Sequence, residues 1–174
     1  EVLSLDQDNE YLSNIKQQTR RMSSLISDLL SLAKLDESKE LLENKELNLS
    51  VLIGKCVLQF DALAFERGRE IVTDFDSNIS ITGDAASIEK IVTILLDNAL
   101  KYSEDREIRC TLKKNGEKAT FSVYNKAYSV KADTKTKIFE RFYRAENSRS
   151  RDTGGSGLGL SIAKKIAEIN KWKI

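Results

Sequence analysis

The densest group of chemically suggestive residues is a glycine-rich segment, GGSGLG, at residues 154–159. It contains four of the eight glycines of the chain and leads directly into a helical pattern. Glycines let backbone N–H groups approach an anion, and a helix N-terminus adds unpaired donors and the positive end of its dipole. The segment lacks the Gly-Lys-Ser/Thr of a Walker loop, and no strand immediately precedes it as in a dinucleotide-binding turn. The sequence therefore predicts a phosphate-binding loop, with a flexible hinge as the alternative.

A second signal is Asn98, a polar residue in the apolar stripe of a predicted helix. It shares a helix face with Ile91, Leu95 and Tyr102, so its amide is expected to point toward the buried side. A buried amide needs a partner, which is either local backbone or a ligand such as Mg²⁺, whose other ligands would be water and phosphate oxygens. Lys101, in the next turn, either reaches the same phosphates or is a solvated lysine at the helix end. The residues alone leave both pairs of alternatives open.

Two more segments carry groups that could bind a nucleotide. Asn125 has the same strand parity as Val123, so it is expected to face inward, where it could hydrogen-bond a planar base; a turn residue is the alternative. In the segment IFERFYR, at residues 138–144, the aromatic residues are expected to anchor a lid to the core, and Arg141 or Arg144 could reach phosphate. A surface helical turn with two buried rings explains this segment equally well.

The composition of the 174-residue chain excludes several classes of protein. With 28 Lys+Arg, 27 Asp+Glu and no basic block, it lacks the basic face of a protein that binds nucleic acid through phosphates. It has no histidine, which removes imidazole bases, Ser-His-Asp triads and most zinc sites. Cys56 and Cys110 fit neither a disulfide framework nor a metal site and are expected in the core. The sequence shows no membrane-spanning apolar run and no signal peptide, so we expect a soluble chain.

The first part of the chain predicts one long helix. From Asn9 to Leu35, apolar residues recur in a heptad seam that widens toward its end. So wide a stripe needs partners on more than one side, as in a four-helix bundle. Residues 1–6 are expected to be the end of an earlier element and a connection. A charged linker at residues 34–46 places a domain boundary near Asn44.

The rest of the chain predicts an α+β domain, with helices on one face of a mainly antiparallel sheet. Ser50 and Asp84 are expected to cap helices, Asn115-Gly116 to form a hairpin turn, and residues 126–153 to form a functional lid or a disordered segment. Residues 172–174 are expected to begin a strand at what looks like a cut C-terminus. The expected strands lie at residues 47–49, 71–75, 79–81, 108–112 and 121–123, and the expected helices at 51–66, 85–102 and 158–170.

Three segments, in this order along the chain, resemble the catalytic ATP-binding domain of sensor histidine kinases of two-component systems. They are LLDNALKYS (95–103), IFERFYR (138–144) and GGSGLGLSIAKKIAE (154–168). Residues 11–37 resemble the second helix of the family's dimerisation and phosphoacceptor hairpin. The resemblance implies a Bergerat-type α/β sandwich, a mixed, mainly antiparallel sheet covered by helices on one face, preceded by a long bundle-forming helix. It divides the chain into a partial dimerisation hairpin, residues 1–43, and a catalytic ATP-binding domain, residues 44–174, truncated at its C-terminus.

The resemblance also implies roles for individual residues. Asn98 would be the Mg²⁺ ligand and act with Lys101 in catalysis, Tyr102 would line the nucleotide, and the glycines would wrap the phosphates of ATP. Phe139 and Phe142 would belong to the aromatic box of the lid. The residues implied to bind ATP are Asn98, Lys101, Tyr102, Asn125, Ala127, Phe139, Phe142, Arg144, Gly155, Gly157, Leu158, Gly159 and Leu160.

The chain departs from the family pattern at three places. It has no histidine, so the acceptor of the γ-phosphoryl group is expected on a first hairpin helix outside this chain. Ile94 stands where the family often has Asn, one turn before the metal ligand. The segment NKAYS, at residues 125–129, stands where the family reads adenine with Asp-x-Gly-x-Gly, so Asn125 would accept a hydrogen bond from the adenine amino group without a charge.

The leading hypothesis is a histidine kinase fragment that binds Mg²⁺-ATP and transfers its γ-phosphoryl group to a histidine on the absent helix. We expect a homodimer through the N-terminal helix, a cognate response regulator, no nucleic acid, and a cytoplasmic location in a sensor anchored to the membrane by upstream segments. One alternative is a catalytically degenerate nucleotide-binding and dimerisation regulator, which the altered adenine motif favours and the GGSGLGL segment opposes. Another is a serine kinase of the anti-sigma-factor type, which the long heptad helix disfavours.

Overall fold

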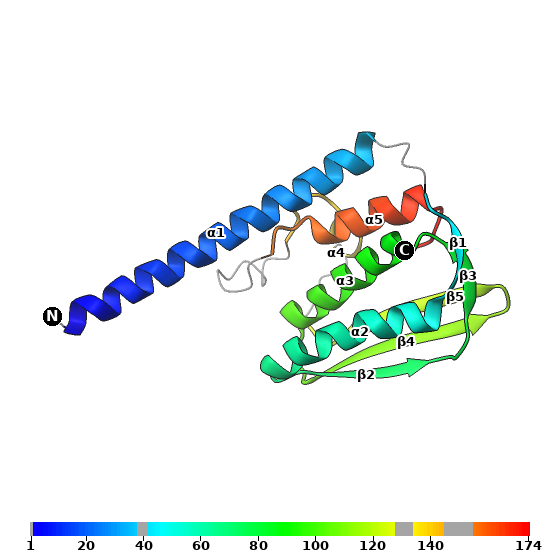
Figure 1. Cartoon of the computed structure of the whole chain (residues 1–174), viewed down its shortest axis with the longest axis horizontal. Helices are drawn as coiled ribbons and strands as arrows, with labels where there is room; N and C mark the ends of the chain where they lie inside the picture. Colours follow the sequence, from blue (N-terminus) through cyan, green and yellow to red (C-terminus); the bar gives the residue numbers. More distant parts are fainter. Residues whose placement is uncertain (1, 38–41, 128–133, 145–154) are drawn as a thin grey trace.

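A 36-residue helix, α1 (Val2–Glu37), leads into an α/β body (Figure 1). The helix is longer than expected, because it includes residues 2–6, which the sequence assigned to an earlier element and a connection. No glycine or proline interrupts it, so nothing in its sequence ends the helical hydrogen bonding. The computed structural model describes residues 2–37, 42–127, 134–144 and 155–174.

The strands of the described residues form two small sheets. They are β1 (Lys45–Asn48), β2 (Glu70–Phe75), β3 (Ser80–Gly83), β4 (Glu107–Asn115) and β5 (Lys118–Asn125). One sheet pairs β1 with β3 antiparallel; the other has the order β2-β4-β5, with β2 parallel to β4 and β4 antiparallel to β5. The expected mixed, mainly antiparallel arrangement is confirmed. The hairpin turn at Asn115-Gly116 is also where it was predicted, with Gly116 at φ 62°.

Helices cover one face of the sheet, as expected. They are α2 (Leu49–Glu66), α3 (Ala85–Tyr102), the single turn α4 (Thr134–Lys137) and α5 (Gly159–Ile169). α2 and α3 pack beside each other on the sheet, α5 packs on α3, and α1 packs on α5, so the molecule is built in layers (Figure 1). Within the described ranges, no helix is both long enough and apolar enough to span a membrane.

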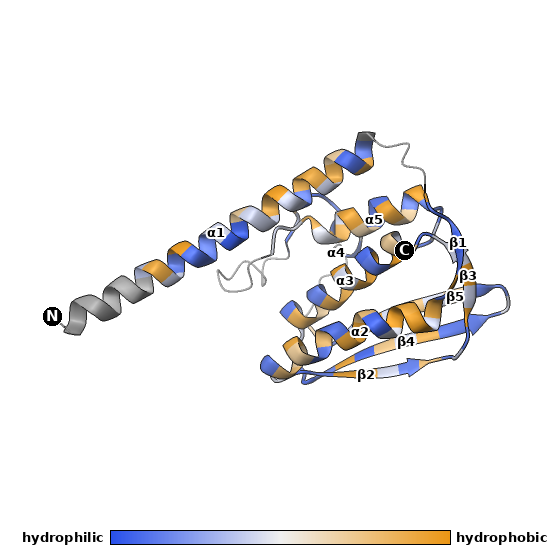
Figure 2. Ribbon diagram, in the orientation of Figure 1, coloured by the Kyte–Doolittle hydropathy of each residue, from blue (hydrophilic) through white to orange (hydrophobic). Residues whose placement is uncertain are grey.

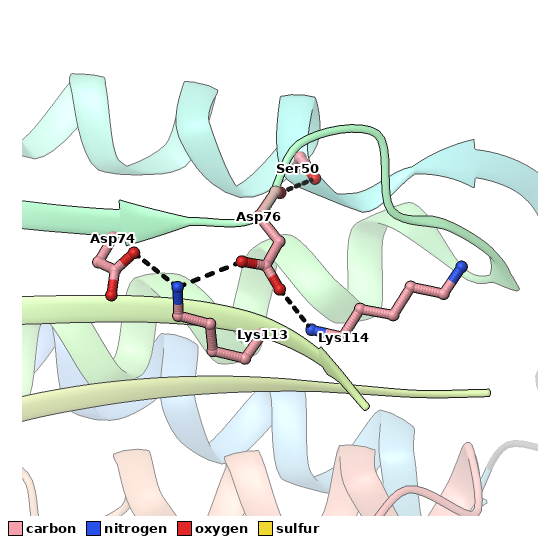
Figure 3. Close-up of polar contacts among 5 residues, drawn as sticks. All are labelled: Ser50, Asp74, Asp76, Lys113 and Lys114. Carbon is pink, nitrogen blue, oxygen red and sulfur yellow. Dashed lines mark hydrogen bonds and ion pairs between the residues drawn. The ribbon is translucent and has the colours of Figure 1, made fainter. Parts of the chain in front are cut away.

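The two predicted helix caps have different outcomes. Asp84 caps α3 as predicted, because its carboxylate accepts a hydrogen bond from the Ser87 N–H at 2.7 Å. Ser50 does not cap α2; Asn48 does, since its side chain accepts from the Val51 N–H at 3.1 Å. The Ser50 hydroxyl instead donates to a backbone carbonyl in the turn after β2, at 2.8 Å (Figure 3).

The larger of two apolar clusters lies between the sheet and the helices α2 and α3. Ile53, Leu96 and Ile108 are almost completely buried in it. Cys56 and Cys110 are buried and unpaired, as expected, and burial raises the pKa of the Cys110 thiol to about 11. Both cysteines are therefore small core residues with protonated thiols at neutral pH.

The smaller apolar cluster joins α1 to α5. Leu32 of α1 is 4% exposed and packs with Leu158, Ile162 and Ile166. Figure 2 shows apolar residues recurring along the half of α1 that lies over α5. The rest of the α1 seam is exposed, which agrees with the expectation that this helix needs further partners. Its exposed apolar residues are Tyr11, Leu12, Ile15, Met22, Ile26, Leu29 and Leu30.

The strand expected at residues 172–174 does not form. Asn170 follows α5 as its C-cap, and Lys171 then has φ 59°, which turns the chain back on the helix. The Trp172 N–H donates to the Ala167 carbonyl at 2.8 Å, and Trp172 packs against both apolar clusters. The end of the chain is thus held by packing and a turn, and not by strand pairing.

Candidate functional site

The last two turns of α3 carry three of the predicted site residues. Asn98, Lys101 and Tyr102 are each half-buried, whereas Leu96 and Leu100 belong to the fully buried stripe of this helix. Asn98 is therefore less enclosed than the apolar pattern predicted. Within the described part of the chain its side-chain amide makes no hydrogen bond, so no local backbone group occupies it.

Lys101 is engaged by an acidic neighbour on the same helix. Its Nζ lies 2.5 Å from Oδ2 of Asp97, one turn earlier. Such i,i+4 pairs at a partly exposed position contribute little free energy, so the contact can be exchanged for another anion. Binding of a phosphate by Lys101 would require this exchange.

Tyr102 joins the end of α3 to the glycine-rich segment. A Cβ atom placed on Gly155 would lie 2.8 Å from the Tyr102 hydroxyl oxygen, which is too close for a real contact. Gly159 approaches the same helix, since a Cβ there would lie 3.4 Å from Cγ2 of Ile94. Gly155 therefore allows a close packing against Tyr102 that a side chain would disturb, whereas a Cβ at position 159 would make an ordinary van der Waals contact with α3.

The segment at residues 138–144 lies against the same glycine-rich segment. The Phe142 N–H donates to the Gly157 carbonyl at 2.9 Å, and a Cβ on Gly157 would lie 2.9 Å from the carbonyl carbon of Phe142. Gly157 also has φ 72°, a conformation that favours glycine. All three segments of the predicted motif set thus meet in one place.

The aromatic residues of this segment do not all behave as expected. Phe139 and Tyr143 are half-buried, but the Phe142 side chain is 58% exposed. The expectation that the aromatic residues anchor the segment to the core is therefore wrong for Phe142. Its backbone has φ 64° and is held by the hydrogen bond to Gly157, and this turn directs the ring outward.

Asn125 is the last residue of β5 and pairs with Ile108 of β4. Side chains along β5 alternate between exposed and half-buried, and Asn125 is on the half-buried side together with Val123, as predicted. The carbonyl of the next residue, Lys126, accepts a hydrogen bond from the Glu104 N–H at 2.8 Å. This bond brings the end of β5 to the chain that leaves α3.

The remaining predicted residues surround these contacts. Ala127 is exposed, and Arg144 and Leu160 are half-buried. Leu158 is fully buried, so only its backbone could meet a ligand, and its N–H donates to the Ser156 hydroxyl at 3.1 Å. The parts of the predicted lid outside the described residues are 128–133 and 145–153, together with Gly154 of the glycine-rich segment.

Helix α1 contacts the site through two carboxylates, which the sequence did not predict. The Ser156 hydroxyl, in the glycine-rich segment, donates to Asp28 Oδ2 at 2.8 Å. Two turns further along α1, Asp36 pairs with Arg141 at 2.8 Å and with Lys165 at 3.0 Å. The hydrogen bonds from Arg141 and then from Lys165 hold the pKa of Asp36 below its ordinary value.

These contacts change the interpretation of Arg141, which was one of two residues proposed to reach phosphate. In the structure its guanidinium is bound to Asp36 of α1. A sequence signal for the contact existed, because Asp28, Leu32 and Asp36 recur every fourth residue and therefore share one helix face. Two carboxylates on either side of a buried leucine indicate a docked helix face.

A magnesium site here would depend mainly on the nucleotide. Among the described residues, no group of three or more acidic, cysteine or histidine side chains could hold a metal ion. Mg²⁺ beside a nucleotide does not need such a group, because phosphate and water oxygens supply most of its ligands. The side-chain amide of Asn98, which makes no hydrogen bond among the described residues, could supply a neutral oxygen as a further ligand.

Comparison with known protein families matches residues 83–173, about half of the chain, to the histidine kinase-, DNA gyrase B- and HSP90-like ATPases. The matched range contains α3, β4, β5 and α5. The matched range also contains all of the predicted ATP-binding residues. The match therefore falls on the part of the molecule where the three segments meet.

Relatives of the chain are sensor proteins. Sensor protein DltS of Streptococcus agalactiae (serotype III, strain NEM316) is 38% identical over 167 residues, which are 95% of this chain and 42% of DltS. Sensor histidine kinase CusS of Escherichia coli (strain K12) is 35% identical over 165 residues, 93% of this chain and 34% of CusS. The chain thus spans less than half the length of these relatives.

Solved structures share the fold. The nucleotide-free catalytic domain of the histidine kinase ThkA superposes with a TM-score of 0.64 and 26% identity, over 74% of this chain and 82% of that chain. Full-length ShkA in complex with AMPPNP superposes with a TM-score of 0.77 over 92% of this chain and 34% of that chain; at 24% identity, this likeness shows the fold alone. The Bergerat-type fold with a long N-terminal helix is therefore confirmed.

Proposed function

Because the chain belongs to the family of histidine kinase-, DNA gyrase B- and HSP90-like ATPases, we propose that it is the ATP-binding catalytic part of a two-component sensor histidine kinase. It binds Mg²⁺-ATP and transfers the γ-phosphoryl group to a histidine outside this chain, which itself contains none. The sensor kinases among its relatives support this function. No finding from the comparisons favours a catalytically degenerate regulator.

The observation that carries the proposal is the meeting of three segments that are distant in the sequence. Tyr102 packs on Gly155, and Phe142 is hydrogen-bonded to Gly157. The glycines lie directly before α5, where backbone N–H groups and the helix dipole suit an anion. A flexible hinge would not need such close contacts, and we therefore prefer the phosphate-binding interpretation.

In this proposal each side chain has a distinct task. Asn98 offers its amide oxygen to Mg²⁺, which when bound would neutralise phosphate charge. Lys101 leaves Asp97 and binds phosphate, while Gly155, Gly157 and Gly159 let the backbone approach it. Catalysis of this kind depends on positioning and charge neutralisation more than on a general base.

The base is proposed to bind at the opposite end of the site. Asn125 faces inward at the end of β5, where its side-chain oxygen can accept a hydrogen bond from the adenine amino group. The hydrogen bond between Glu104 and Lys126 fixes this strand end relative to α3. Phe139 and Arg144, both half-buried, would complete the enclosure of the nucleotide.

The proposed kinase needs partners beyond this chain. We assign residues 1–43 to a dimerisation hairpin and residues 44–174 to the catalytic domain, because the exposed apolar seam of α1 suits a helical bundle with a second copy. A response regulator would receive the phosphoryl group from the histidine. Because ATP is a substrate of the cytoplasm, we assign the chain to the cytoplasmic side of a sensor that is anchored to the membrane by other segments.

Incubation of the full-length protein with γ-labelled ATP and Mg²⁺ tests this function. We expect a label that is lost in acid and stable in base, as phosphohistidine is. The 174-residue chain alone should remain unlabelled, because it has no histidine. Acid-labile, base-stable label on the 174-residue chain alone, or no such label on the full-length protein, would contradict the proposal.

A further inference from the structure

The loop between α3 and β4, residues 103–106, is held by several hydrogen bonds. Ser103 is buried, and its hydroxyl donates to the Asp105 carbonyl at 2.9 Å. The Glu104 N–H donates to the Lys126 carbonyl at 2.8 Å. The loop therefore links α3 to the end of β5, the two elements that carry the proposed metal and adenine contacts.

Arg69, in the turn between α2 and β2, clamps this loop. Its guanidinium donates to the carbonyls of Ser103 and Asp105, the latter at 2.7 Å. Gly68, at φ 66°, ends α2 with a sharp turn, after which the Arg69 N–H donates to the Ala64 carbonyl at 2.8 Å. The Nε atom of Arg69 is buried and has no partner among the described residues. The side chain is therefore packed in place and is not a mobile surface group.

We propose that Arg69 is a positioning residue of the nucleotide site, an inference that rests on the proposed function. The Ser103 carbonyl, at the C-cap of α3, lacks an intrahelical partner and lies at the negative end of the helix dipole, so a cation stabilises it. The rigid fork of a guanidinium fixes two carbonyls at once, which a lysine cannot do. Through these carbonyls, Arg69 fixes the loop that follows Tyr102 of α3, and this loop is bonded through Glu104 to Lys126, the residue after Asn125 of β5.

The clamp acts next to the two half-buried residues that end α3. Val92, Leu96 and Leu100 fix the helix to the core by burial, but Lys101 and Tyr102 are only half-buried. Burial of Ala99 and Leu100 fixes the backbone of the last turn, so the loop that follows it affects mainly how Lys101 and Tyr102 are placed. Binding sites lose affinity when such supporting contacts let ligand-binding groups move by fractions of an ångström.

Calorimetric titration of the 174-residue chain with Mg²⁺-ATP tests the inference. At a temperature where the variants remain folded, we expect Arg69→Gln to raise the Kd about tenfold, because both carbonyl contacts of the guanidinium are lost. Arg69→Lys keeps the positive charge and can donate to one of the two carbonyls, so we expect it to raise the Kd only about threefold.

Two control variants separate positioning from general stability. Val57→Ala removes buried methyl groups from α2 and lowers the Tm without touching the loop, so the Kd should not change. Arg106→Gln removes an exposed guanidinium from the loop itself. Its Nε lies 3.7 Å from Oε2 of Glu70, so little is lost, and the Kd should also remain unchanged.

The outcomes distinguish this inference from the function on which it rests. Equal Kd values for Arg69→Gln and the unmodified chain would overturn the role of Arg69 alone. The role would also be overturned if Val57→Ala lost as much Tm as Arg69→Gln and its Kd rose by the same factor, since reduced stability would then explain both rises. If Arg69→Gln does not fold, Arg69→Lys decides the question. An unchanged Kd for Arg69→Lys would overturn the positioning role of Arg69, and a raised Kd would support it. Absence of ATP binding by the unmodified chain would overturn the proposed function and this inference together.

Discussion

Asn125 is the residue at which one substitution most directly tests the proposed base contact. A hydrogen bond to a charged acceptor contributes about 1.5–3 kcal/mol and a neutral one about 0.5–1.5 kcal/mol. We therefore expect Asn125→Asp to gain about 1–1.5 kcal/mol, or up to about tenfold in ATP affinity. Affinity for inorganic triphosphate should not change, because only the base contact is altered. Calorimetric titration with both ligands measures the difference. Equal weakening of both, or a change in neither, would identify Asn125 as a turn residue.

Asp76 is held by its neighbours at the end of β2 (Figure 3). Its carboxylate accepts from the Lys114 N–H at 2.9 Å and lies 3.2 Å from Lys113 Nζ, which also contacts Asp74 at 2.6 Å. The bond from the Lys114 N–H, and then that from Lys113, hold the pKa of Asp76 below its ordinary value. The ionised carboxylate therefore contributes its full stability above about pH 3.9, the ordinary pKa of Asp, and loses it as the pH falls through the lowered folded-state value.

We expect Asp76→Asn to lower the Tm at neutral pH and to have a smaller effect once the pH falls below the lowered pKa of Asp76, where the unmodified carboxyl also becomes protonated. Thermal melts over this pH range, followed by the fluorescence of the single tryptophan, Trp172, measure the effect. Glu107→Gln is a suitable control, because Glu107 forms an exposed pair with Arg109. A difference in Tm that grows toward low pH would be the opposite of the expected result.

At the residue scale, local periodicity predicted more than long-range contact could. Strand parity placed Asn125 on the inner side of β5, and the pattern before α3 identified the cap Asp84. The burial of Asn98 was overestimated, because part of its helix stripe packs toward α5 and not into the main core. Arg69 and Asp28 bond to residues far away in the sequence, so no local pattern indicates their partners.

At the scale of the elements, α1 is attached to the body by the apolar contact of Leu32, which lies between Asp28 and Asp36 on the same helix face. Leu32 is buried against α5, while Asp28 and Asp36 lie one turn to either side and bond to Ser156 and Arg141. The Asp36 pairs are partly exposed and therefore contribute little free energy. Burial of Leu32 is the main stabilising contribution to this docking.

We expect Leu32→Ala to weaken the docking of α1 by about 2–4 kcal/mol, the cost of removing a buried leucine side chain. Hydrogen exchange in the second half of α1 should become faster, whereas amides of β4 and β5 should change little. Ser24→Ala, at an exposed position of the same helix, serves as the control. Unchanged exchange in Leu32→Ala, or equal acceleration in Ser24→Ala, would show that Leu32 does not hold the helix.

The types of the elements were predictable from periodicity, but several of their ends were not. The strand expected at residues 108–112 extends over Glu107–Asn115 in the structure. Its polar end residues pair with β2 and β5, but they lack the apolar alternation from which the ends of a strand are predicted. Ser50 and Asn48 are both good capping residues, and only the fold shows that the Ser50 hydroxyl is used by the turn after β2. Residues 172–174 resemble a strand in sequence but are held by packing of Trp172.

At the scale of the whole molecule, the layering determines the site. The sheet and α3 provide one side, the glycine-rich segment before α5 provides the other, and α1 lies on the outside of α5 (Figure 1). The order of the three motifs was enough to predict this fold, because it resembled that of a known family. The spacing of Asp28, Leu32 and Asp36 marks a docking face of α1, but its partner in the glycine-rich segment was not predictable, since it depends on how two helices pack across the molecule.

Calorimetric titration of the chain and of Asn98→Ala with ATP, with and without Mg²⁺, shows whether these layers form a Mg²⁺-ATP site. We expect the unmodified chain and the control Thr93→Ala, exposed on the same helix, to bind ATP in a Mg²⁺-dependent manner. Asn98→Ala should lose most of this binding and keep its Tm, because the amide makes no hydrogen bond among the described residues that could be lost. Unchanged affinity together with a lowered Tm would contradict the account, because Asn98 would then be a structural residue.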